Sequence, residues 1–228
     1  MNAQRRITKK EMKQDKLVST AFKAANYVQR NKQPFIIGAI VIVAVGIILY
    51  FFSISEAEKK EEALVHLGQG DVDFLIGNVD QAIEDYKLTM EQYGSTLAGR
   101  KAYIHLGTIY NSQSNYDEAK EIFTEYLDKF DKEKPYLLWR AALVGAATAH
   151  RNLGEYAEAA ELYERALDTD PSRETKAYLL MDAASCYAEA GQYDQALSLY
   201  EQVQEEYPFT TYTTRAELEI AKIKVKQL

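Results

Sequence analysis

The segment Gly154-Glu-Tyr-Ala-Glu-Ala-Ala-Glu-Leu-Tyr163 decides the fold, because its pattern occurs four times in the chain. The pattern is a glycine or serine, then an aromatic residue or valine two positions later, an alanine three positions after that, and an aromatic residue four positions further on. The other copies occupy residues 77–86, 114–123 and 191–200. Their alanines lie 37, 40 and 37 residues apart, so the pattern predicts an array of similar units.

Each position of the pattern has a physical reason. The glycine or serine ends a first helix and permits a turn. The alanine lets paired helix axes approach closely, and the aromatic residue fills the space between units. Because each unit leaves an apolar face that only its neighbour can cover, the units must stack. The predicted structural positions are Gly77, Ala82, Tyr86, Gly107, Tyr110, Ala119, Phe123, Gly154, Ala159, Tyr163, Pro171, Gly191, Ala196, Tyr200 and Pro208.

The pattern resembles the tetratricopeptide repeat (TPR) family, whose unit is a pair of antiparallel helices. Leu106-Gly107 followed by Tyr110 matches the family's first-helix signature, and Ala166-Leu167 before Pro171 matches its end. The resemblance implies an all-α fold: a TPR α-solenoid over residues 55–228. It predicts about four repeats, at residues 61–95, 99–133, 140–173 and 177–210, and a C-terminal capping helix at 211–228.

The array departs from the family pattern in two places. Its steps exceed the usual ~34 residues because loops are longer, most visibly Asp131-Lys-Glu-Lys-Pro135. The capping helix has a charged face and an apolar face, which suit a solubilising cap. The charged face holds Arg215, Glu219, Lys222 and Lys226, and the apolar face holds Leu218, Ala221 and Val225.

Residues 35–52, FIIGAIVIVAVGIILYFF, contain no charged side chain. As a helix they span about 27 Å, close to the thickness of a bilayer's hydrocarbon core. Thirteen of them are Ile, Leu, Val or Phe, which together favour insertion by about 4–8 kcal/mol. The sequence therefore predicts a transmembrane helix at 35–54 in contact with the lipid bilayer. No helix breaker follows, so we expect the helix to continue into the first repeat.

Two other interpretations of this segment stay open. One is a cleaved signal peptide, since Ser53-Ile-Ser55 offers a small-x-small pattern for cleavage. The 34-residue leader and the length of the apolar run disfavour it. The other is a buried core helix, which the absence of a polar stripe disfavours. We expect an uncleaved anchor.

Charge divides the chain at the apolar segment. Residues 1–34 hold nine Lys or Arg and two acids, whereas the rest holds 18 Lys or Arg and 32 acids. The positive-inside rule then predicts a cytoplasmic leader and a periplasmic or other extracytoplasmic array, in a single-pass protein of the inner membrane. The acidic body excludes nucleic acid as a partner. The leader is either an amphipathic helix or a flexible basic tail.

Motifs for chemistry are absent from the sequence. A single cysteine, Cys186, excludes a disulfide framework and a cysteine zinc cluster. No P-loop, nucleophile elbow or zinc-protease pattern occurs, and His66, His105 and His150 are dispersed over three repeats. We therefore expect no enzyme activity, cofactor or metal.

The TPR resemblance implies that the first helices of the repeats line a groove for an extended peptide or a partner helix. A groove of mixed polarity suits adaptable binding, although these positions would also suit ordinary repeat surface. The candidate groove residues are Phe74, Leu75, Lys101, Thr108, Asn111, Val144, Arg151, Asn152, Tyr178 and Met181.

The layout of the whole chain resembles the bacterial ancillary SecYEG translocon subunit family. That resemblance implies Sec translocon components, periplasmic chaperones or exported clients as partners, and binding without covalent chemistry. A scaffold for outer-membrane, division or secretion machinery is the alternative. An enzyme that uses groove carboxylates is a more distant one, because the sequence shows no paired acids for it.

Overall fold

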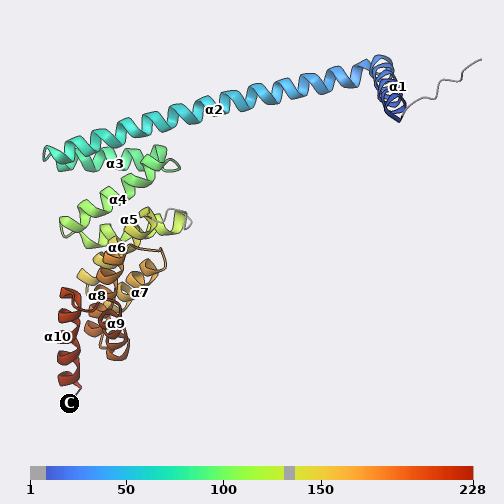
Figure 1. Cartoon of the computed structure of the whole chain (residues 1–228). Helices are drawn as coiled ribbons and strands as arrows, with labels where there is room; N and C mark the ends of the chain where they lie inside the picture. Colours follow the sequence, from blue (N-terminus) through green and yellow to red (C-terminus); the bar gives the residue numbers. More distant parts are fainter. Residues whose placement is uncertain (1–8, 131–136, 228) are drawn as a thin grey trace, which may run out of the picture. The chain divides into compact units, whose positions relative to one another are not determined.

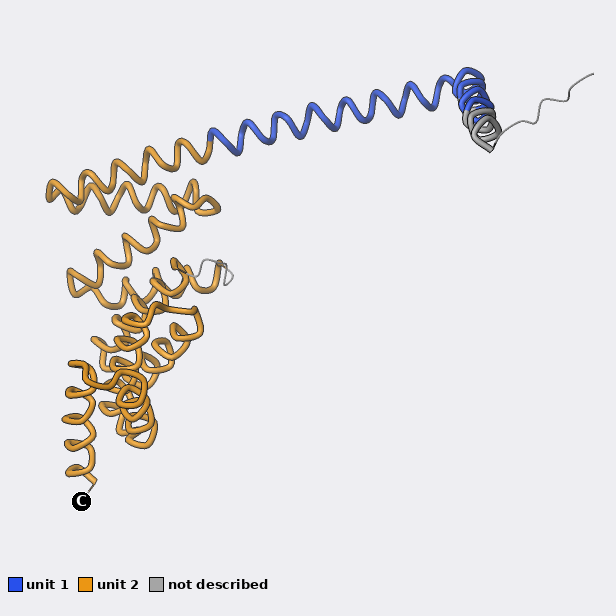
Figure 2. Tube along the Cα trace, in the orientation of Figure 1, with its two compact units in different colours: residues 1–58 blue, residues 59–228 orange. Residues whose placement is uncertain are grey.

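The computed structural model describes residues 9–130 and 137–227, and the ordered elements within these ranges are all α-helices. The chain divides into two compact units, residues 1–58 and 59–228, shown in different colours in Figure 2. The loop expected at Asp131–Pro135 lies outside the described residues.

The first unit contains α1, Lys9–Arg30, and the beginning of α2, Lys32–Leu75. The described part of the leader is therefore helical from Lys9 onward. Within the described chain, α2 is the one helix long and apolar enough to cross a membrane, with a mean hydropathy of 3.0 over its most apolar 18 residues. A signal sequence near an N-terminus would share this length and composition. Pro34 lies in the first turn of α2, where its missing N–H costs no hydrogen bond.

The second unit begins with the end of α2 and continues through eight further helices in the described ranges. Figure 1 shows them following one another along the array. They are α3 (Val79–Tyr93), α4 (Leu97–Ser112), α5 (Tyr116–Lys129), α6 (Leu137–Asn152), α7 (Tyr156–Leu167), α8 (Arg173–Glu189), α9 (Tyr193–Glu206) and α10 (Thr211–Lys226).

The turns inside the helix pairs have one geometry. Gly77, Ser114, Gly154 and Gly191 all adopt positive φ angles, of 87°, 64°, 80° and 76°. Glycine reaches this left-handed region without strain, whereas Ser114 carries a steric cost there. The helix-breaking residue of the repeat pattern therefore reverses the chain between the two helices of each pair.

The core of the array is built from the alanine and aromatic positions of the pattern. Ala82, Ala119, Ala159 and Ala196 have no exposed surface, and the four aromatic side chains that follow them are at most 1% exposed. The Phe123 ring shows most clearly how closely the aromatic side chains pack against the neighbouring helices. A Cβ atom on Gly107 of α4 would lie 2.6 Å from its ring, and one on Gly145 of α6 would lie 2.2 Å from it. The ring therefore occupies a slot that only two glycines leave open.

Helix α10 closes the array with a different face from the one predicted. Its buried residues are Ala216, Ile220 and Ile223, which pack on the core of the last repeat. The predicted apolar face is exposed, with Leu218 at 55% and Val225 at 71%. The assignment of the packing face was wrong because α10 has apolar residues on two opposite sides, and periodicity alone does not say which side is covered.

Candidate partner-binding face

Side chains link each first helix of the array to the next. His105 Nδ1 of α4 lies 3.2 Å from Asp71 Oδ1 of α2. Asn111 Nδ2 of α4 donates a hydrogen bond to the carbonyl oxygen of Gly145 in α6, at 3.0 Å. Arg151 Nη1 of α6 lies 3.4 Å from Asp182 Oδ1 of α8. These links define a continuous surface, called here the first-helix face, formed by α2 from residue 59, α4, α6 and α8.

A polar cluster occupies the α6–α8 part of this face. Asp182 is only 8% exposed and has the Arg151 guanidinium as its charged neighbour. Tyr178 lies one turn before Asp182 and is 45% exposed. Burial raises the pKa of the Tyr178 hydroxyl, and its hydrogen bond with the Asp182 carboxylate raises it further. The tyrosine is therefore a neutral donor at physiological pH, beside a buried carboxylate.

Two oxygens of the first-helix face are buried without a hydrogen-bond partner among the described atoms. They are Oδ2 of Asp182 and Oδ1 of Asn111. Leaving such an acceptor unpaired costs about 1–3 kcal/mol, so native structures seldom do it without a reason. Both atoms are also closed to solvent, so a partner does not reach them directly. What the cluster presents to a partner is the partly exposed Arg151 guanidinium and the exposed part of Tyr178.

An apolar cavity of about 220 Å³ lies at the α2–α4 end of the array. Phe74, Ile104 and Thr108 contribute to its lining, and Tyr86 is at its floor with 1% exposure. The Tyr86 hydroxyl donates to Asp71 Oδ1 at 2.6 Å; burial first and this bond second raise the pKa of Tyr86. The cavity has room for one side chain of a partner.

The candidate groove residues differ in accessibility. Lys101 and Thr108 are exposed on the side of α4 that carries His105, and Val144 and Arg151 are half-buried on one side of α6. Met181 is buried, with 4% exposure. Leu75 is 81% exposed and lies on a different side of α2 from Phe74, since successive helical residues are 100° apart. Asn152 is exposed at the end of α6 and donates a hydrogen bond to the carbonyl oxygen of Thr148.

Sequence reasoning missed the most informative residue of the face, Asp182. The sequence does contain a feature that singles out Asp182: it is the one charged residue in the run Leu179-Leu-Met-Asp-Ala-Ala-Ser-Cys186. An acid in such a run is either exposed or paired, and it follows Tyr178 by one helical turn. The partner, Arg151, lies 31 positions earlier, so the pairing follows only from the stacking of two repeats.

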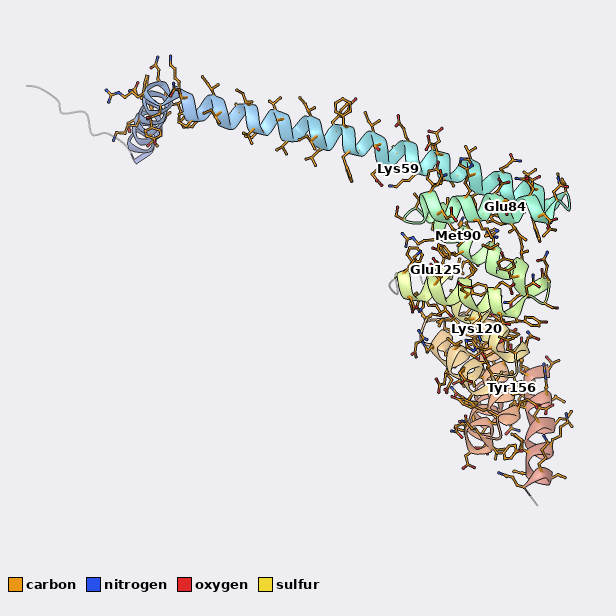
Figure 3. All side chains as sticks on the ribbon, turned by 180° about the vertical axis from the view of Figure 1, so that it is seen from behind. Lys59, Glu84, Met90, Lys120, Glu125 and Tyr156 are labelled. Atoms are coloured by element: carbon orange, nitrogen blue, oxygen red, sulfur yellow. The ribbon has the colours of Figure 1, made fainter. Side chains whose placement is uncertain are left out.

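A larger hollow, of about 840 Å³, lies on the second helices α5 and α7. Its charged walls are paired: Lys120 Nζ lies 2.9 Å from Glu155 Oε1, and Lys129 Nζ lies 2.5 Å from Glu125 Oε1. Figure 3 labels Lys120 and Glu125, which both project from α5. No cluster that could hold a metal ion is found among the described residues. Both lysines of the lining are therefore already engaged in ion pairs, and we place the partner-binding face on the first helices, which carry the polar cluster and the apolar cavity.

Two tetratricopeptide repeat models match the chain, at residues 104–174 and 151–213. The chain is a TPR protein. Among solved structures, a TPR protein from Parabacteroides merdae aligns with a TM-score of 0.60 and 19% identity, over 74% of this chain and 61% of that one. The chain thus spans less than two thirds of that relative. Repeats of a putative kinesin light chain from Podospora anserina align with a TM-score of 0.55 and 17% identity, over 72% of this chain and 86% of that one.

MamA from AMB-1 also aligns, with a TM-score of 0.52 and 19% identity, over 67% of this chain and 77% of that one. Among curated proteins, none matches the sequence. At these identities the likeness establishes the fold alone. TPR domains in general bind proteins or peptides.

Proposed function

We propose that this TPR protein is a membrane-tethered adaptor that binds extended segments of partner proteins on its first-helix face. The observation that carries this proposal is the cluster of Arg151, Tyr178 and Asp182, in which the buried Asp182 carboxylate holds a partly exposed Arg151 guanidinium beside the exposed Tyr178. A peptide offers the carbonyl groups to which the Arg151 guanidinium can donate hydrogen bonds. The cavity beside Phe74 accepts an apolar side chain of the same segment. Binding proceeds without covalent chemistry.

The tether in this proposal is the apolar segment at residues 35–52, with the basic leader in the cytoplasm and the array on the extracytoplasmic side of an inner membrane. The charge division of the chain supports this orientation, because positively charged flanks remain in the cytoplasm. The acidic array is also repelled by anionic lipid surfaces. Its first-helix face is therefore available to soluble polypeptides.

The partners we propose are polypeptides leaving the Sec translocon and the chaperones that receive them. The support is the order of the parts: a basic leader, one apolar helix and a TPR array, as in the ancillary SecYEG translocon subunit family. Extended chains leaving a channel expose backbone C=O groups, to which the Arg151 guanidinium of this face can donate. An adaptor tethered beside a channel also meets these chains at a high effective concentration.

A photocrosslinking amino acid at Tyr178 tests the proposal in the full chain, in its membrane. We expect adducts with extended polypeptides, enrichment of Sec components, and a large loss of adducts in the Asp182→Asn variant. The control places the same group at Glu201, which is exposed on α9. Equal adduct yields at positions 178 and 201 would show that the first-helix face is not the binding surface. Adducts at 178 without Sec components would remove only the Sec role.

A further inference from the structure

The end of α2 carries an apolar stripe that no part of the described chain covers. Leu64, Val65, Val72, Leu75 and Ile76 are 60%, 66%, 52%, 81% and 66% exposed. At 100° per residue Val65 and Val72 lie opposite Ala63 and Gly70, which face the core, and Leu64 and Leu75 flank them; Ile76 follows directly after the helix. This stripe is the outward face of the first helix of the array. Exposed apolar patches of this kind mark interaction sites.

Gly68 lies in the middle of the stripe. A Cβ atom on Gly68 would meet nothing within 4 Å, so no contact within the described chain requires a glycine there. Glycine in a helix interior is nevertheless destabilising relative to alanine. Gly70 is different, because its Cβ would lie 2.8 Å from the Tyr86 ring. The missing side chain of Gly68 leaves room for another helix to approach closely at this point.

The last helix of the array has a matching stripe. Leu218, Ala221 and Val225 of α10 are exposed on the side opposite its buried residues. In the second unit, both terminal helices therefore present an apolar outward face, whereas every intermediate helix pair is covered on both sides by its neighbours in the array. Figure 1 shows the end of α2 and α10 at the two ends of this stack.

The charges beside the two stripes are opposite. The exposed carboxylates beside the α2 stripe are those of Glu61 and Glu62, since Asp71 and Asp73 are engaged within the array, whereas α10 holds Arg215, Lys222, Lys224 and Lys226 against two glutamates. Two copies of the α2 stripe would bring four carboxylates together, so charge disfavours pairing through the same face. The α2 stripe of one copy and the α10 stripe of another are complementary in both hydrophobicity and charge.

We propose that copies of this protein associate end to end, with the outward face of α10 in one copy bound to the outward face of α2 in the next. The contact continues between chains the stacking that holds the repeats together within one chain. It is heterologous, since different surfaces of the two copies meet, and it therefore builds rings or open chains of copies. It involves neither Asp182 nor the cavity beside Phe74.

Disulfide cross-linking of the purified full chain in detergent tests the contact. The native Cys186 is 1% exposed, so an introduced cysteine is the accessible thiol. We expect a disulfide when the Val72→Cys and Leu218→Cys variants are mixed, and a ladder of oligomers when one chain carries both. The control pairs Val72→Cys with Glu201→Cys, which is exposed on α9, and should give no such product. Cross-linking of Val72→Cys alone at the rate of the mixture would overturn the proposal in favour of same-face pairing.

Charge reversal gives an independent readout through the mass of the oligomer measured by light scattering. Glu61→Lys and Lys226→Glu should each weaken association roughly two- to fivefold, the size expected of exposed ion pairs. A mixture of the two variants restores the contact, because the reversed charges meet. Under same-face pairing, Glu61→Lys alone would strengthen association and Lys226→Glu would have no effect. A mass that stays monomeric for the unchanged chain at every concentration would also overturn the proposal.

Gly68→Leu separates a specific helix contact from nonspecific hydrophobic clustering. The substitution enlarges the apolar stripe, so clustering would increase. A close helix approach at this glycine would instead be blocked, and we expect the dissociation constant to rise by about tenfold or more. Peptide cross-linking at Tyr178 should be unchanged in this variant, so failure of the end-to-end contact is distinguishable from failure of peptide binding.

Discussion

The slot around Phe123 allows two opposing effects of one substitution to be compared. Gly145→Ala should stabilise α6 by about 0.8–1 kcal/mol through helix propensity. The new Cβ, however, would lie 2.2 Å from the Phe123 ring, which is 1% exposed. The ring cannot move toward α4, because it already fills the space that the absent side chain of Gly107 leaves there. Overpacking of a buried core costs about 1–3 kcal/mol, so the clash outweighs the propensity gain.

Gly68→Ala is the matched control, because its Cβ would meet nothing within 4 Å. Here only the propensity gain applies, and stability should rise by about 0.5–1 kcal/mol. Because the propensity gain is the same in both variants, they should differ by the overpacking cost, about 1–3 kcal/mol in unfolding free energy. For a unit of this size the corresponding difference in melting temperature is about 2–12 °C.

Trp139 reports the transition, since it is the single tryptophan of the chain and packs on the core from α6. Its fluorescence is followed during thermal unfolding of the dilute full chain in detergent. Phe123→Leu combined with Gly145→Ala should cost less than the two changes summed, because the smaller side chain relieves the clash. The reasoning is refuted if Gly145→Ala raises the melting temperature as Gly68→Ala does, or if the double variant is additive.

Three further predictions concern pH, the turn geometry and the anchor. The hydrogen bond from Lys120 lowers the pKa of Glu155 in the folded protein. The pair therefore stabilises the fold at pH values above the glutamate's ordinary pKa of 4.5, and this stabilisation is lost as the pH falls through the lower pKa of the folded state. Lys120→Met should reduce that acid dependence, worth at most about 1 kcal/mol for a partly exposed pair, in unfolding curves recorded at pH 3–7; the part that remains comes from His150, which also contacts Glu155. Gly154→Ala should lower the unfolding free energy by about 1–2 kcal/mol in denaturant titrations, because φ is 80° there; no change would contradict the strain argument. Alkaline carbonate should leave the full chain in the membrane pellet, and soluble protein that begins after Ser55 would contradict the anchor.

The repeat core could be predicted from sequence because its signal is redundant. The same small residue occurs at Ala82, Ala119, Ala159 and Ala196, and each is fully buried. One alanine would carry little information, whereas four alanines at nearly equal steps predict the same helix packing in every unit. The glycine or serine before each of them fixes the turn, since the positive φ angle there admits few other residues. Periodicity thus predicts both the helix pairs and the residues between them.

The polar cluster could not be predicted in the same way. Arg151 and Tyr178 were candidates for the binding face, but Asp182, which joins them, was not. Its contact with Arg151 spans two repeats, so it depends on the angle at which α6 and α8 stack. Sequence spacing within a helix says which residues share a side, whereas the stacking angle is set by the many side chains between the helices.

The error in α10 and the proposed end-to-end contact have one physical origin. Within the array, each helix pair is covered on both sides, so its apolar residues all face neighbours. At an end of the array one side has no neighbour, and a solubilising cap would be polar there. Leu218 and Val225 are instead apolar on that side, and Leu64 and Val72 are apolar at the other end. A periodicity argument assumes one covered face for each helix, and it therefore fails at the helices that carry a second apolar face. If charge-reversed copies associate as expected, that second face is covered as well, by another copy of the chain.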